Sequence, residues 1–148
     1  MPLDDARLRT VLRAIHDTLS PAEASAILDV ARLAAAIDKK SNVDEMLVLL
    51  SLTRIICEMA GLAEMPMPTK AIDEHRLFDI SDSLVPTGAR ELAFACAFLV
   101  MILDLELTQE ENKLVHMLGD AMVLDPSRAK HLSKEMEALV RVSRIELG

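Results

Sequence analysis

The sequence predicts an all-α fold, a bundle of about seven helices that contains two similar helix-corner-helix units. Apolar residues make up 51% of the 148 residues but aromatic residues only 2%, so the core is built from aliphatic side chains, which is typical of packed helices. Four glycines and six prolines leave little turn chemistry for many short strands. An acidic segment occurs twice, at 38–45 and 104–111, and both its ends are displaced by the same offset, since 104 − 38 equals 111 − 45. A chain of this length fits a single domain, residues 1–148.

An apolar stripe predicts the first helix. Leu8, Val11, Leu12, Ile15 and Leu19 follow one another at the spacing that places them on one face of a helix. We therefore expect this helix to reach Leu19.

The second helix is expected to begin after Ser20 and to end at about Asp38. Ser20 can cap the helix, Pro21 suits its first position, and Glu23 can complete a capping box. The alanines of this segment indicate a close approach to another helix.

The third helix is expected to begin after Asn42 and to continue to about Met59. Asn42 is the predicted cap, and Glu45 stands three residues later, where its carboxylate can accept from the cap residue. From Met46 onward the segment is apolar on most sides, which predicts a central position in the bundle.

The fourth and fifth helices are expected at about residues 70–84 and 88–104. The fourth is the more polar, whereas the fifth is hydrophobic nearly all round, so we expect it in the middle of the bundle. We therefore predict that the third and fifth helices form the centre of the fold.

Two further helix starts follow the second acidic segment. Thr108 is the predicted cap of a sixth helix, with Glu111 as its reciprocal partner. Asp125 precedes Pro126 and is the predicted cap of a seventh helix, which runs to about Ile145.

Helix capping explains most of the acidic residues at the two corners. A carboxylate in the first turn of a helix satisfies backbone N–H groups and interacts favourably with the helix dipole. Asp38 and Asp104 need another explanation, because they stand at the C-terminal ends of the second and fifth helices, where negative charge is mildly unfavourable.

The alternative is a divalent-cation site shared by the two corners. If the corners lie side by side, the carboxylates of Asp38, Glu45, Asp104 and Glu111 could converge. Carboxylate oxygens suit Ca²⁺, Mg²⁺ and Mn²⁺. Neither corner has the EF-hand pattern, and we favour the capping interpretation.

The duplicated corner resembles the TerB-like family, which is named for bacterial tellurite-resistance proteins. In both copies an Asp ends a helix, a short turn follows, and a Ser, Thr or Asn cap precedes an acidic pair. The matching residues are Ala36, Asp38, Asn42, Asp44 and Glu45, then Asp104, Thr108, Glu110 and Glu111. The resemblance implies an all-α fold of about seven helices in two similar halves, together with roles in stress responses and metal binding at acidic sites. The family pattern has Gly after the Asp, whereas this chain has Lys39 and Leu105.

Charge and hydropathy exclude several partners. The formal net charge of −8 argues against nucleic-acid binding, and we expect Arg7, Arg9 and Arg13 to lie on a solvated helix face. The longest apolar stretch, 92–103, is too short to cross a bilayer, which takes about 20 residues. No secretory signal is visible, so a cytoplasmic location without a membrane span is expected. Cys57 and Cys96 lie in apolar runs and are expected to be buried, reduced thiols.

No pattern for catalysis is present. The chain has no Gly-rich phosphate loop, nucleophile elbow or paired cysteines, and its four histidines are dispersed. His131 and Glu135 are four residues apart and are expected to form a surface pair. The resulting prediction is a non-catalytic, cytoplasmic stress-response or accessory domain that acts through protein partners. The alternatives are a plain interaction or scaffold domain that binds no ion and, less favoured, a metal-dependent enzyme.

Overall fold

The computed structural model describes residues 4–37, 43–62, 80, 82, 84, 86–103 and 106–147, with side chains described up to residue 142. Every regular element in these ranges is a helix, which confirms the all-α prediction. The described helices are α1 (Asp5–Ile15), α2 (Pro21–Ile37), α3 (Val43–Ala60), α5 (Thr87–Met101), α6 (Gln109–Ala121) and α7 (Pro126–Leu147). The helix expected at 70–84 lies outside the described residues, apart from single positions within it.

The first helix is shorter than its apolar stripe predicts. α1 ends at Ile15, because His16 adopts an extended backbone with φ −162° and ψ 127°. Leu19 is nevertheless buried, and its backbone N–H donates to the carbonyl oxygen of Met59 at 3.3 Å. The stripe therefore identified the side that faces the core, with Val11 and Ile15 only partly buried, but extended the helix too far.

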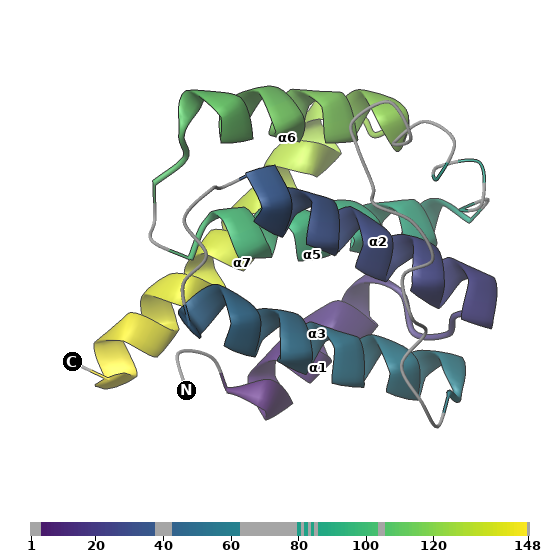
Figure 1. Cartoon of the computed structure of the whole chain (residues 1–148), viewed down its shortest axis with the longest axis horizontal. Helices are drawn as coiled ribbons and strands as arrows, with labels where there is room; N and C mark the ends of the chain where they lie inside the picture. The colour runs from purple at the N-terminus through teal and green to yellow at the C-terminus, as the bar shows by residue number, and fades with distance from the viewer. Residues whose placement is uncertain are drawn as a thin grey trace.

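α5 is the central helix of the bundle, as its composition predicts. It packs against α1, α2, α3, α6 and α7 (Figure 1). Eleven of its fifteen residues are buried, including the stacked rings of Phe94 and Phe98. A helix that is apolar on all sides is stable only when neighbours cover all sides, and α5 has those neighbours.

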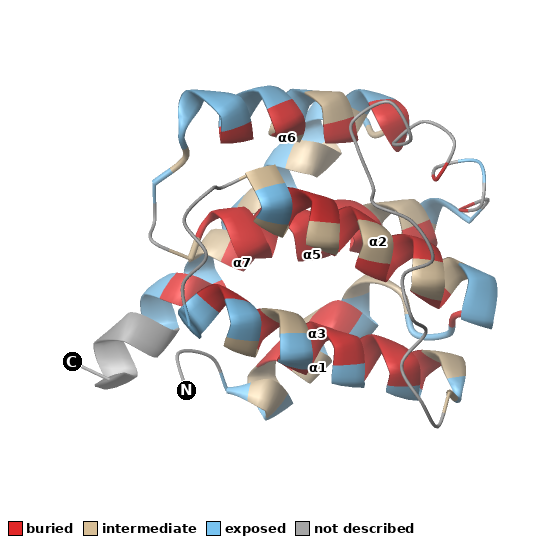
Figure 2. Cartoon of the chain, viewed as in Figure 1, coloured by how far each residue is buried: buried red, intermediate tan, exposed pale blue. Residues whose placement is uncertain are grey.

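The expected central position of the third helix is wrong. α2, not α3, is the main partner of α5, and α3 packs chiefly against α2. The physical reason lies in the small side chains of α2, such as Ala24, Ala31 and Ala34, which are buried and allow two helices to approach closely. α3 consequently has an outer side that faces solvent (Figure 2).

The helices on either side of the two acidic corners begin at matching positions. The starts of α2 and α5 are separated by the same sequence offset as the starts of α3 and α6, since 87 − 21 equals 109 − 43. The ends of these helices that flank the corners lie on the left-hand side of the molecule in Figure 1. The start of α1 and the end of α7 lie toward the lower left of the same view.

Candidate functional site

The start of α6 has the capping-box geometry expected from the sequence. The hydroxyl oxygen of Thr108 accepts from the backbone N–H of Glu111 at 3.1 Å. In return, the carboxylate of Glu111 accepts from the backbone N–H of Thr108 at 2.9 Å. The Glu111 side chain is only 2% exposed, so these hydrogen bonds keep a buried carboxylate in contact with polar partners.

Glu45 occupies the corresponding place in α3. It is the third residue of its helix, as Glu111 is of α6, and it is 6% exposed. These two are the buried charged side chains within the described residues. Asn42, the predicted cap of α3, lies outside the described residues. Two buried carboxylates at the same helical position are the strongest local likeness between the two corners.

Two other predicted caps have the corresponding hydrogen bonds. At the start of α2, Ser20 and Glu23 form a reciprocal pair, with distances of 3.1 Å and 2.8 Å to each other's backbone N–H groups. At the start of α7, one carboxylate oxygen of Asp125 accepts from the backbone N–H and from the hydroxyl of Ser127. These bonds lower the pKa of Asp125, because they stabilise its charged form.

The structure locates only two of the four predicted ion ligands. Glu45 and Glu111 lie in α3 and α6, whereas Asp38 and Asp104 are outside the described residues. Among the residues that are described, no three His, Cys, Asp or Glu side chains lie together as a metal site would require. The chemistry visible at Glu111 is helix capping.

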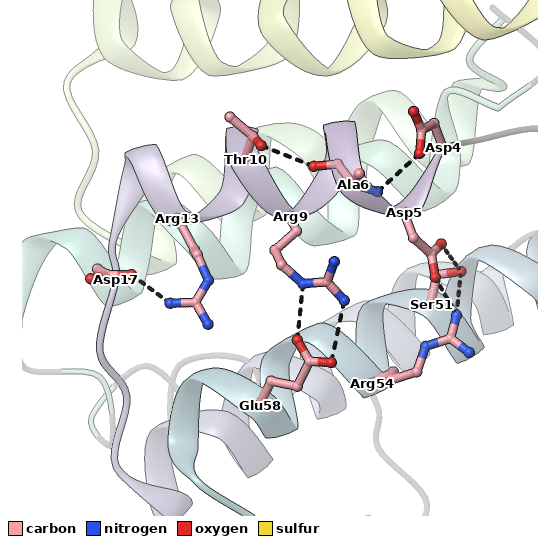
Figure 3. A network of polar contacts seen from close by, with 10 residues as sticks. All are labelled: Asp4, Asp5, Ala6, Arg9, Thr10, Arg13, Asp17, Ser51, Arg54 and Glu58. Atoms are coloured by element: carbon pink, nitrogen blue, oxygen red, sulfur yellow. Dashed lines mark hydrogen bonds and ion pairs between the residues drawn. The ribbon is translucent and has the colours of Figure 1, made fainter.

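Polar contacts tie α1 to α3 (Figure 3). Arg9 donates to both carboxylate oxygens of Glu58, at 2.9 Å and 3.2 Å, and these contacts raise the pKa of Arg9. Asp5 accepts from the hydroxyl of Ser51 and from the guanidinium of Arg54. Exposed ion pairs of this kind contribute little to the free energy of unfolding. Their main consequence is that the charges on this side of α1 are balanced by α3, Arg9 by Glu58 and Asp5 by Arg54.

The remaining side chains with reactive chemistry have structural surroundings. Cys57 and Cys96 are buried free thiols, as expected. Burial raises the pKa of Cys96 to about 12 and also raises that of Cys57, so both favour the protonated, unreactive form. His131 and Glu135 form the predicted surface pair, with 3.0 Å between Nε2 and the carboxylate.

Sequence reasoning missed an exposed apolar surface on α3, which we call the α3 face and define as Val43, Met46 and Leu50. Their side chains are 71%, 61% and 53% exposed. Met46 and Leu50 also line a pocket of about 210 Å³ between α2 and α3, together with Leu28 of α2. The i, i+3, i+7 spacing of the three residues is present in the sequence, but the segment from Met46 onward is apolar on most sides, which favoured a central helix over one with an exposed apolar side.

The chain was compared with protein-family models, with curated proteins and with solved structures, and none of the three comparisons found a match. Across the described ranges, no helix combines the length and the apolar character that a membrane span requires.

Proposed function

We propose that this chain is a non-catalytic accessory domain that acts by binding a protein partner through the α3 face. A stress-response role follows from the resemblance to TerB-like proteins, and a cytoplasmic location belongs to the same proposal. The alternative with the same fold is a plain scaffold domain.

The α3 face carries the proposal. Large apolar side chains scattered singly on a surface are ordinary, but here three lie at helical spacing on one side of one helix. A pocket of about 210 Å³ opens beside them, into which a partner's side chain could insert. At protein interfaces the binding energy is concentrated where anchoring side chains fill such pockets.

Two features support the TerB-like part of the proposal. The helices flanking the two corners begin at one common sequence offset, and Glu45 and Glu111 are buried at matching positions. Both fit the expectation of two similar halves. Because both corners carry a carboxylate, a divalent cation is the second candidate ligand there.

The partner test uses affinity capture from the native cell with three forms of the chain. Met46→Glu together with Leu50→Glu places charge on the α3 face and should remove the captured protein. Val123→Glu is the matched control, because Val123 is also apolar and 73% exposed but lies between α6 and α7. Equal capture by all three forms, with unfolding transitions that remain cooperative, would contradict the proposal.

The cation part has its own test. Ca²⁺, Mg²⁺ and Mn²⁺ are added in turn to metal-stripped protein while the thermal unfolding midpoint is followed. An ion at 100 times its dissociation constant should raise the free energy of unfolding by about 2.7 kcal/mol. If millimolar ion leaves the unfolding midpoint unchanged, the cation hypothesis is rejected and the scaffold alternative, which binds no ion, stands.

A further inference from the structure

A second apolar surface lies between α1 and α7, on a different side of α1 from the ion pairs with α3. Both helices pack against α5, and a groove of about 380 Å³ separates them. We call this the α1–α7 groove. In Figure 3, Thr10 projects from the side of α1 opposite Arg9, toward the pale yellow ribbon of α7. The groove is therefore independent of the α3 face.

The walls of the groove are apolar and mostly small. α1 contributes Thr10, Val11 and Ala14, and α7 contributes Ala138, Leu139 and Val142. Ala14 and Ala138 are exposed, and their short side chains leave the space between the helices open. Its volume lies within the range of about 300–1,000 Å³ that is typical of ligand pockets.

The length of the groove favours a short helix as its occupant. Its lining runs from residue 7 to residue 14 on α1 and from residue 135 to residue 142 on α7. Seven residues of helix rise about 10.5 Å, which is two turns. An amphipathic helix presents its apolar anchors at i, i+3 or i+4, and i+7, over the same length. A long acyl chain would extend beyond such a groove.

The charged side chains at the two ends of the groove favour one orientation of a bound helix. The N-terminal end of α1 and the C-terminal end of α7 lie at the same lower left corner of Figure 1, so the two helices are antiparallel. Arg7 therefore stands at the end of the groove near Val142, and Glu135 stands at the end near Ala14. Helices favour acidic residues in their first turn and basic residues in their last. A helix parallel to α1 would place its first turn at Arg7 and its last turn at Glu135.

We propose that the α1–α7 groove binds two turns of an amphipathic helix from a protein partner, with an acidic first turn at Arg7 and a basic last turn at Glu135. This inference rests on the proposed function, since it names a second contact through which the same accessory domain holds its partner. The apolar anchors supply the affinity, and the charges at the two ends select the orientation.

The test measures fluorescence anisotropy of a labelled, helix-stapled peptide with leucines one turn apart, glutamates in its first turn and lysines in its last. A peptide with these charges exchanged is the matched probe. We expect the exchanged peptide to bind more weakly, and Glu135→Lys to reduce the difference between the two. Ala138→Trp should fill the groove and weaken binding by at least about tenfold. Ala14→Trp should do the same from the other wall. Val123→Trp, a matched exposed position, should bind as the wild type does.

Several results would overturn the inference. One is equal binding of the peptide by the wild type and by folded Ala138→Trp and Ala14→Trp variants, and another is absence of binding by the wild type. If palmitate displaces the peptide, and if it binds the wild type but not the variants in which Trp fills the groove, the groove is a lipid-binding site. A dimer that Ala138→Trp dissociates would assign the groove to a second copy of the chain. If Met46→Glu with Leu50→Glu, rather than the groove variants, removes peptide binding, this inference fails while the proposed function stands.

Discussion

The helix pair α2–α3 and the helix pair α5–α6 obey the same rules at their ends but differ on their outer surfaces. Both second helices carry a buried glutamate at their third residue, and both end in a Schellman motif. In α3 the backbone N–H of Leu62 donates to the carbonyl of Cys57 at 2.9 Å. In α6 the N–H of Leu124 donates to the carbonyl of Gly119 at 3.0 Å. The helix ends are thus alike wherever backbone groups must be satisfied.

The outer surfaces differ in length and polarity. α3 has 18 residues and exposes the apolar α3 face, whereas α6 has 13 residues and exposes polar side chains such as Glu110, Lys113 and His116. A polar outer side needs no partner, and an apolar one is stabilised by a partner. The two pairs thus share a structural framework, and the exposed apolar side chains through which we propose partner binding lie in the first.

The largest effects are expected in the core that the two pairs share. Leu33 of α2 and Leu99 of α5 are both buried, and they hold equivalent places in the two pairs, since 99 − 33 equals the offset between the starts of the two helices, 87 − 21. Leu33→Ala and Leu99→Ala should each lower the free energy of unfolding by about 2–5 kcal/mol, through lost burial and the cavity left behind. Chemical denaturation measures both. A loss below about 1 kcal/mol at either site would show that this helix pair is not the core.

Removing the buried carboxylates tests the likeness at the helix starts. Glu111→Ala leaves the N–H of Thr108 without its acceptor and should cost about 1–3 kcal/mol. Glu45→Ala should have a similar effect if the two corners are equivalent. Glu110→Ala, one residue earlier and exposed, is the control and should change stability little. If Glu45→Ala and Glu111→Ala change the free energy of unfolding in opposite directions, the two corners are not equivalent.

The helix ends should respond with opposite signs. Gly61 and Val123 both have positive φ, at 68° and 55°, a conformation that costs a β-branched residue more than glycine. Val123→Gly should therefore stabilise the protein by about 1 kcal/mol, and Gly61→Val should destabilise it by at least that amount. Beyond its neighbours in the chain, a Cβ at Gly61 would meet no heavy atom within 4 Å, so backbone strain is the expected cause. Thermal unfolding measures both variants. Shifts of the same sign in the two unfolding midpoints would contradict this account.

The smallest effect is expected at Asp125, whose helix belongs to neither pair. Hydrogen bonds from Ser127 lower its pKa in the folded state, so its contribution to stability is present above the unfolded pKa of about 3.9. That contribution is lost as the pH falls through the lower, folded pKa. The thermal midpoints of the wild type and Asp125→Ala should thus differ at neutral pH and converge in acid. A difference that grew in acid would have the wrong sign.

Sequence patterns predicted the all-α class, the central position of α5 and the starts of most helices, because capping residues and apolar periodicity are local signals. They failed for the position of α3, because that position depends on which helix can approach α5 most closely. The small side chains of α2 allow the closer approach, and the pattern of one helix does not show how closely another helix packs. The exposed state of Met46 and Leu50 follows from that position. The α1–α7 groove was equally out of reach, since it arises between two segments that are far apart in the chain.

Hydroxyl-radical footprinting of the chain with its captured partner tests the central claim most directly. Met46 in α3 is 61% exposed and should be oxidised readily in the free protein. With the partner bound, oxidation of Met46 should fall severalfold, while the exposed side of α6 at His116 should be modified as before. Protection of His116 with Met46 unchanged would place the partner on the other helix pair and contradict the account.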